Sequence, residues 1–283
     1  MTKLLPTSEG PAPTVARTIV VPLDGSRFAE RALPVAGAIA RRVGGRVLLM
    51  ATYWDGADRD RRTAYLEKVA GQVDGVPTET ISIDEHPNAP AIRHIVSDHP
   101  DRIVCMTSHG RGRLGWAVLG SVAEQVARES RHPILLVGRH CRTDWPLEMR
   151  HMVVCVDGAT VADPIVPIAS QWAKALGLDV QVAVAVHPLD YEGAGFPHEV
   201  VDAIVARFVA DGVDAAPAML HGSYIAGAIA DYAGDLPAAL VAMNTHARGG
   251  AARIALGSVA MGTVGLAECP VLLAPREDVH VGR

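Results

Sequence analysis

The sequence predicts an α/β protein in which one folding unit occurs twice, head to tail. The chain has 283 residues, which at about 100–150 residues per domain suggests two domains. Apolar residues make up 49% of the chain and aromatic residues only 4%, so small aliphatic side chains must build the core, as in helices packed on a buried parallel sheet. Apolar runs alternate with amphipathic helix-like segments along the chain, which is typical of parallel βαβ units with right-handed crossovers.

The repeat is visible directly in the letters. When Arg17 is placed over Arg150, RTIVVPLDGS (17–26) aligns with RHMVVCVDGA (150–159). Further along, the alignment moves by four positions, and turn and motif residues then match: His109 with His246, Gly120 with Gly257, Ser121 with Ser258, and Pro133 with Pro270. A net insertion in the middle of the second copy explains this change.

Each copy is predicted to contain five strands in the same order. Apolar runs rich in Val and Ile indicate buried strands, and glycines mark the ends of the first helices. In the first copy we expect strands at 18–23, 46–52, 78–83, 102–106 and 133–139, with helices at 28–43, 57–73, 89–98 and from Gly120-Ser121. In the second copy we expect strands at 152–156, 179–186, 215–220, 238–243 and 270–276, with helices at 162–176, 197–210, 224–234 and from Gly257-Ser258.

The predicted boundaries follow from this alignment. We expect a disordered tail at 1–16, domains at 17–139 and 150–276, a charged linker at 140–149 and a second tail at 277–283.

Composition argues against several classes of protein. The net charge is −5 and no basic stripe is present, which disfavours nucleic-acid binding. No apolar run reaches the ~18 residues of a membrane span, and no signal-peptide core follows the N-terminus. The four cysteines form neither a CxxC motif nor a zinc-ligand pattern, which indicates a reducing, cytoplasmic location.

The most informative stretch is TSHGRGRLGWAVLGSVAEQVARES (107–130), which follows the fourth strand. Its glycines let the backbone turn tightly and approach a ligand. The helix that opens at Gly120-Ser121 offers free N–H groups and a partial positive charge, which suit a phosphate. The alternative is an ordinary loop with a serine at the helix start. The stretch is neither a Walker A motif nor the dinucleotide fingerprint, which should follow the first strand.

Two polar residues recur beside this loop in each copy. Asp24 and Asp157 end the first strands, where ligands bind in open α/β sheets, and a carboxylate there can accept hydrogen bonds from ribose hydroxyls. The alternative is an Asx-turn or a helix cap. His109 and His246 precede the loops and could contact phosphate or transfer a proton; alternatively, they order the loop by bonding to the backbone.

Together these residues resemble the universal stress protein family. The family pattern is Gly-x2-Gly-x9-Gly-Ser/Thr after the fourth strand, with an Asp after the first. The first copy has Thr107 at the first position, then Gly110 and Gly120-Ser121. The second copy departs further, with Asn244 and Ala247 before Gly257-Ser258.

The resemblance implies two tandem doubly wound domains, each a five-stranded parallel sheet with helices on both faces. It also implies ATP as the ligand, possibly with Mg. Adenine would lie against the second strand near Thr52 or Ala185, ribose at Asp24 or Asp157, and phosphates at the loop and the helix start, which includes Val122 and Val259. Family members often dimerise through the fifth strand, so we expect 134–137 and 271–274 to pair within the chain, in preference to a homo-oligomer.

Three functions remain open. The first is an ATP-binding stress-response regulator with little or no turnover, acting on an unknown regulatory protein. The second is a scaffold that has lost the nucleotide and acts by protein contacts. The third is a slow ATPase or adenylyl-transfer enzyme, for which the sequence shows no catalytic signature.

Overall fold

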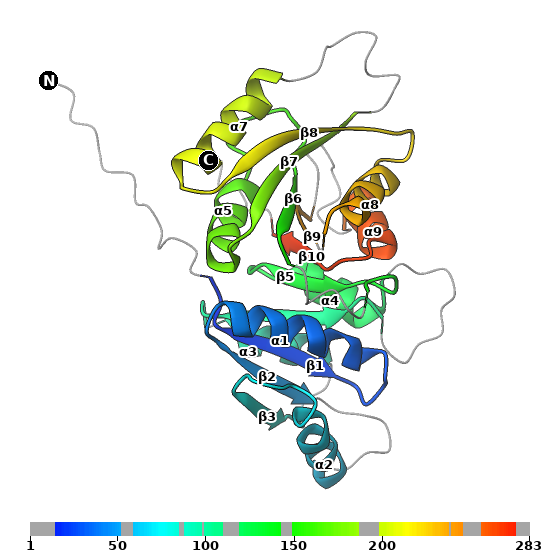
Figure 1. The fold of residues 1–283 in the computed structure, drawn as a ribbon. Helices are drawn as coiled ribbons and strands as arrows, with labels where there is room; N and C mark the ends of the chain where they lie inside the picture. Colours follow the sequence, from blue (N-terminus) through cyan, green and yellow to red (C-terminus); the bar gives the residue numbers. More distant parts are fainter. Residues whose placement is uncertain are drawn as a thin grey trace, which may run out of the picture.

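Ten strands form one continuous sheet with helices packed on it (Figure 1). The computed structural model describes residues 15–51, 59–84, 88–97, 99–109, 119–142, 149–186, 198–237, 239–245 and 256–275. Copy one supplies β1 (Thr18–Leu23), β2 (Arg46–Ala51), β3 (Thr78–Ser82), β4 (Arg102–Thr107) and β5 (Ile134–Val137). Copy two supplies β6 (His151–Cys155), β7 (Asp179–Val186), β8 (Ala215–His221), β9 (Ala239–Asn244) and β10 (Val271–Ala274).

The helices alternate with the strands as predicted, with ends that differ by a few residues. Copy one has the 3₁₀ helix η1 (Ala29–Arg31), α1 (Ala32–Arg42), α2 (Arg59–Ala70), α3 (Asn88–Ser97) and α4 (Ser121–Glu129). Copy two has α5 (Ile165–Leu176), α7 (His198–Ala210), α8 (Ile225–Asp235) and α9 (Ser258–Leu266). The first helix of each copy starts later than predicted, because a turn follows the aspartate that ends the first strand.

The sheet order is β3-β2-β1-β4-β5-β10-β9-β6-β7-β8. Within each copy every strand pair is parallel, and the copies meet through an antiparallel pair in which Leu135 of β5 lies opposite Leu272 of β10. The predicted pairing of the fifth strands within the chain is therefore confirmed. The prediction of two five-stranded sheets is modified, because this pairing fuses them into one.

Strand register confirms the predicted insertion and narrows its position. Thr18 lies opposite Arg46 and His151 lies opposite Asp179, so the first two strands are separated equally along the chain in both copies. The separation along the chain between the second and third strands differs between the copies. Val47 of β2 lies opposite Thr78, whereas Val180 of β7 lies opposite Ala215, four positions further along than an exact repeat would place it. The extra residues therefore lie between β7 and β8.

The joint between the copies is apolar and tight. All four residues of β5 and all four of β10 are buried. Beyond β5, the backbone of Gly138 packs against the carbonyl of Val264 in α9, and the Arg142 N–H donates to the Glu268 carbonyl (2.7 Å). In Figure 1 the two copies accordingly stack on either side of β5 and β10.

Several predicted boundary segments fall outside the described residues. These are 1–14 of the first predicted tail, 143–148 of the predicted linker, and the whole of the second tail. Ala16, which we assigned to the first tail, is only 4% exposed. Across the described part of the chain, no helix combines the length and apolar character needed to span a membrane.

Replacing Gly138 with Ala should loosen the joint. A Cβ atom there would clash with the Val264 carbonyl oxygen, so strand and helix would have to separate. Overpacking of this kind costs about 1–3 kcal/mol, and we expect urea titration to show a free energy of unfolding lower by about 2 kcal/mol. Gly234→Ala in α8 is the matched control, since its Cβ meets nothing within 4 Å and alanine favours helix. Equal destabilisation by both variants would contradict the proposed close packing.

Candidate functional site

Each copy has one switch point, where the strand order changes direction, and we call the region beyond the strand ends at this point the crevice. The chain leaves β1 toward β2 on one side, whereas β4 and β5 lie on the other side. Ligands of open α/β sheets bind at such a switch point, beyond the carboxyl ends of the strands. In copy one the crevice lies between the ends of β1 and β4, and in copy two between the ends of β6 and β9.

Asp24 forms a tight turn at the end of β1. Its Oδ1 accepts hydrogen bonds from the Ser26 N–H (2.9 Å) and the Ser26 hydroxyl (2.6 Å). The Ser26 hydroxyl oxygen in turn accepts from the Ala29 N–H (3.1 Å), and Gly25 has φ of 79°, which glycine adopts without strain. The Asx-turn alternative is therefore correct for this oxygen of Asp24, and the ribose contact stays a prediction.

Copy two repeats this turn in a simpler form. Asp157 Oδ1 accepts from the Ala159 N–H (2.9 Å), and Gly158 has φ of 68°. The alanine carries no hydroxyl to reinforce the turn. Asp157 is also exposed, whereas Asp24 is half-buried.

The start of α4 is fastened to the end of β4 by backbone hydrogen bonds. The Ser108 N–H donates to β5 (3.0 Å), and the Ser108 carbonyl accepts from the Gly120 N–H (2.7 Å). Copy two has the same pair of bonds, with Thr245 donating to β10 (3.0 Å) and accepting from the Gly257 N–H (2.8 Å). Both helix starts therefore lie at the carboxyl edge of the sheet, beside the crevice.

Both helices begin without a capping side chain, because glycine occupies the N-cap position. Ser121 and Ser258 are exposed, and Val122 and Val259 are half-buried, at the first two positions of the helices. The N–H groups of a first helical turn have no intrahelical acceptors and carry partial positive charge. This arrangement can bind an anion.

The residues that lead into the loop of copy one are ordered by side chains. The Thr107 hydroxyl donates to the His109 carbonyl (2.7 Å), and the Ser108 hydroxyl lies 2.9 Å from His109 Nδ1. The Phe28 ring meets the His109 ring edge to face, with centroids 6.1 Å apart. The His109 ring thus contacts the side chains of Ser108 and Phe28, the second of which was not predicted, and both interpretations of His109 stay predictions.

Asn244 has a different role from Thr107 at the corresponding position. Its Nδ2 donates to Asp163 Oδ1 (2.6 Å), which also accepts from the Ile165 N–H at the start of α5 (3.1 Å). Asp163 is only 5% exposed, so its carboxylate depends on these donors. Sequence analysis missed Asp163, for which the available signal was an Asp-Pro pair within the first residues of the helix predicted at 162–176, a pair that favours a later helix start.

The two crevices consequently differ in charge. Copy one has Arg27 and Arg31 in the segment after β1, where copy two has Thr160 and Pro164. Both copies have a carboxylate at the next corresponding position, which is buried in copy two (Asp163) and half-buried in copy one (Glu30).

Some predicted site residues lie outside the described part of the chain. These are Thr52, Gly110 and Ala247, together with His246. Ala185 is described: it lies half-buried in β7, opposite Leu220 of β8.

The described residues include no cluster suited to bind a metal ion, and their cysteine thiols have no lowered pKa that would make them reactive. No group of three or more His, Cys, Asp or Glu side chains is arranged there to hold a metal ion. All four cysteines are free, and burial raises the pKa of the Cys141 thiol to about 12. Cys105 is fully buried in β4.

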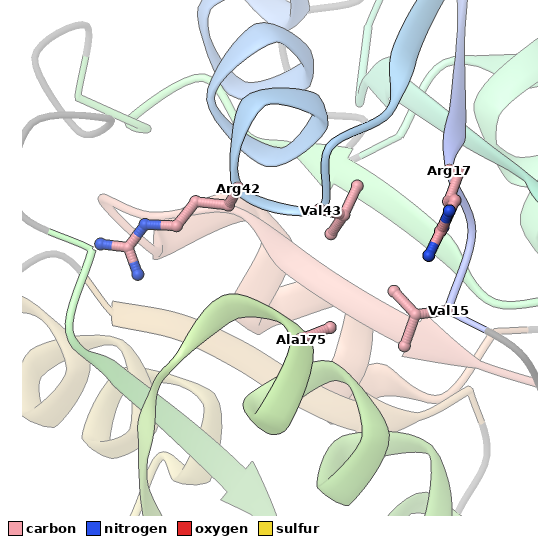
Figure 2. A pocket seen from close by; sticks show the side chains of 5 residues that line it. All are labelled: Val15, Arg17, Arg42, Val43 and Ala175. Atoms are coloured by element: carbon pink, nitrogen blue, oxygen red, sulfur yellow. The ribbon is translucent and has the colours of Figure 1, made fainter.

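A shallow cavity of about 300 Å³ lies near the amino ends of the strands, opposite to the carboxyl ends where the crevices are (Figure 2). It is lined by Val15, Arg17, Arg42, Val43 and Ala175, and the two arginine side chains do not point toward one another. Because Arg17 precedes β1 and Val43 precedes β2, the cavity is at the amino ends of these strands. It is therefore separate from the crevices.

The Arg42 guanidinium belongs to the joint between the copies. It donates to the Met149 carbonyl (3.0 Å) and to the Leu176 carbonyl at the end of α5. A cation at the carboxyl end of a helix also complements the helix dipole.

The fold defines a class: a pair of doubly wound α/β domains, each with an uncapped helix start at its switch point. Comparisons with known proteins agree. The universal stress protein family model matches residues 49–138 and 148–275, and the chain belongs to this family. A Thermus aquaticus relative, "Universal stress protein in QAH/OAS sulfhydrylase 3'region", is 31% identical over 134 residues, which span 43% of this chain and 98% of the relative.

Solved structures show the same two-copy arrangement of the fold. A universal stress protein from Archaeoglobus fulgidus has a TM-score of 0.66 at 16% identity, with 92% of this chain and 99% of that chain covered. A putative universal stress protein from Pseudomonas aeruginosa has a TM-score of 0.64 at 18% identity, with 93% and 94% covered.

Asn244→Ala should destabilise copy two, because the buried Asp163 carboxylate would lose a donor. Hydrogen bonds to charged groups contribute about 1.5–3 kcal/mol, so we expect the free energy of unfolding to fall by about 2 kcal/mol in urea titration. Thr107→Val is the control at the corresponding position of copy one, where a neutral hydrogen bond is lost at a cost of about 1 kcal/mol. A cost for Asn244→Ala no greater than that of Thr107→Val would show that the amide does not support the carboxylate.

Proposed function

We propose that copy one binds an adenine nucleotide, ATP in the first place, and that the protein is a stress-response regulator with little turnover. One observation carries this proposal: the Gly120–Ser108 hydrogen bond brings the uncapped start of α4 to the switch-point crevice that also contains Asp24. An anion-binding helix start and a carboxylate for ribose hydroxyls are thus combined at one edge of the sheet.

The proposed binding mode follows the strand ends. Phosphates lie at the N–H groups of Ser121 and Val122, close to His109. The ribose lies beside Asp24, and adenine lies beyond β2, near Thr52. Magnesium would arrive with the nucleotide, coordinated mainly by phosphate oxygens and water.

Copy two should bind nucleotide more weakly. It lacks counterparts of Arg27 and Arg31, and its Asn244 amide is engaged with the buried Asp163 carboxylate. Ala247 stands where copy one has Gly110. A left-handed backbone there would cost alanine ~1–2 kcal/mol, which is about tenfold in affinity.

The scaffold alternative draws support from copy two itself. A copy that keeps the fold but binds nucleotide poorly is available for contact with a regulatory protein. Because the fifth strands already pair with each other, a homo-oligomer would need another surface. The buried free thiols favour a reducing compartment, and we place the protein in the cytoplasm.

Titration calorimetry with ATP tests the ranking of the two copies. Gly120→Asp places a negative charge where phosphate should bind in copy one, and Gly257→Asp is the same change in copy two. We expect Gly120→Asp to remove the tighter site and Gly257→Asp to affect at most a weaker one. The reverse result would overturn the ranking, and no effect of either variant would remove the helix starts from the site and leave the scaffold function.

ATP hydrolysis should be far slower than the ~10 per second of a typical enzyme. Phosphoryl transfer needs a group that positions or activates water. His109, the imidazole that precedes α4, has its Nδ1 2.9 Å from the Ser108 hydroxyl, so we expect it to bind phosphate and not to act as a base. Steady-state phosphate release from purified protein measures this rate, with Gly120→Asp as the control for contaminating ATPases. Turnover near ~10 per second that disappears in Gly120→Asp would establish an enzyme instead.

A further inference from the structure

In copy one the side chains of Arg31, Phe28 and His109 contact one another in a row, which we call the stack. The Arg31 guanidinium carbon lies 5.4 Å from the centroid of the Phe28 ring. The Phe28 ring meets the His109 ring at an interplanar angle of 89°. Phe28 and Arg31 follow β1, whereas His109 follows β4, so the stack connects the two strand ends that flank the proposed nucleotide site.

The Arg31 guanidinium at one end of the stack is held by two hydrogen bonds. Arg31 donates to the carbonyls of Arg139 (2.8 Å) and Cys141 (2.6 Å), in the segment that follows β5. A guanidinium with two carbonyl acceptors has little rotational freedom, and it attracts the face of an aromatic ring. Arg31 thus restricts the Phe28 ring, which in turn contacts His109.

His109 is held at its inner side by Ser108, whose hydroxyl lies 2.9 Å from Nδ1. When this hydroxyl donates to Nδ1, the proton of the neutral ring resides on Nε2. The ring then carries an N–H donor of the kind that a phosphate oxygen accepts. The hydrogen bond to Ser108 and the edge-to-face contact with Phe28 both restrain its direction.

The stack is specific to copy one. In the alignment that places Arg17 over Arg150, Val161 and Pro164 take the places of Phe28 and Arg31. Neither residue can provide a ring face or a guanidinium. Copy two therefore keeps His246 and a hydroxyl residue, Thr245, in the place of Ser108, but its sequence has no counterpart of the Phe28 ring or the Arg31 guanidinium.

We propose that Phe28 is a positioning residue of the copy-one site, which directs the His109 imidazole toward the phosphates of a nucleoside triphosphate. This inference rests on the proposed nucleotide function. It assigns Phe28 to recognition of the phosphates, and not of the adenine or the ribose. Loss of the ring should consequently weaken ATP binding and leave adenosine binding unchanged.

The test uses Phe28→Leu, which keeps apolar bulk but removes the ring, and Phe28→Tyr, which retains it. Val161→Leu is the matched control in copy two. Calorimetry should show a rise of about five- to tenfold in the Kd for ATP in Phe28→Leu, while the Kd for adenosine stays unchanged. Loss of an aromatic pair of this geometry corresponds to a change in affinity of about this size. Phe28→Tyr and Val161→Leu should stay within about twofold of the wild type.

The imidazole signals of His109 in NMR spectra, assigned with a His109→Gln variant, supply a second readout that needs no nucleotide. They should move in Phe28→Leu and stay close to the wild-type positions in Phe28→Tyr. Equal weakening of ATP and adenosine, or unchanged ATP affinity in Phe28→Leu, overturns the positioning role while the nucleotide function stands. Unchanged His109 signals in Phe28→Leu overturn it as well. Wild-type protein that binds neither ligand overturns the proposed function, and with it this inference.

Discussion

The antiparallel pairing of β5 with β10 is the contact on which the rest of the structure depends. A five-stranded copy alone would leave the backbone groups of an apolar edge strand without partners. Here each fifth strand satisfies the other, and all eight of their residues are buried. The pairing also fixes the relation of the helices across the joint, where Gly138 meets the Val264 carbonyl and Arg42 reaches the end of α5.

The two copies are alike in backbone and different in side chains. The hydrogen bonds that fasten α4 to β4 recur between α9 and β9 with nearly the same lengths. The side chains around the crevices have diverged: copy one has an arginine, a phenylalanine and a histidine in contact, whereas copy two has an asparagine bound to a buried aspartate. The fold therefore provides two equivalent crevices, and the loop side chains decide what each of them can bind.

Local patterns in the sequence were sufficient for much of this architecture. Alternating apolar runs predicted the strands, and the change in repeat spacing predicted the insertion that strand register places between β7 and β8. Contacts between distant residues were not predictable in this way. Asn244 and Asp163 are 81 positions apart, and nothing in their own segments identifies them as partners. Phe28 meets His109 only because β1 and β4 are neighbours in the sheet.

Joining two copies in one chain changes what a single substitution can do. In a symmetric homodimer every replacement appears twice, so a change that harms one crevice harms both. In this chain Thr107 and Asn244 occupy corresponding positions but are encoded separately, so each can change without the other. One half can keep a demanding ligand while the other accumulates changes that would otherwise be eliminated by selection. Because the two copies are joined in one chain and share a core through the β5–β10 pair, the second half can specialise without loss of that core.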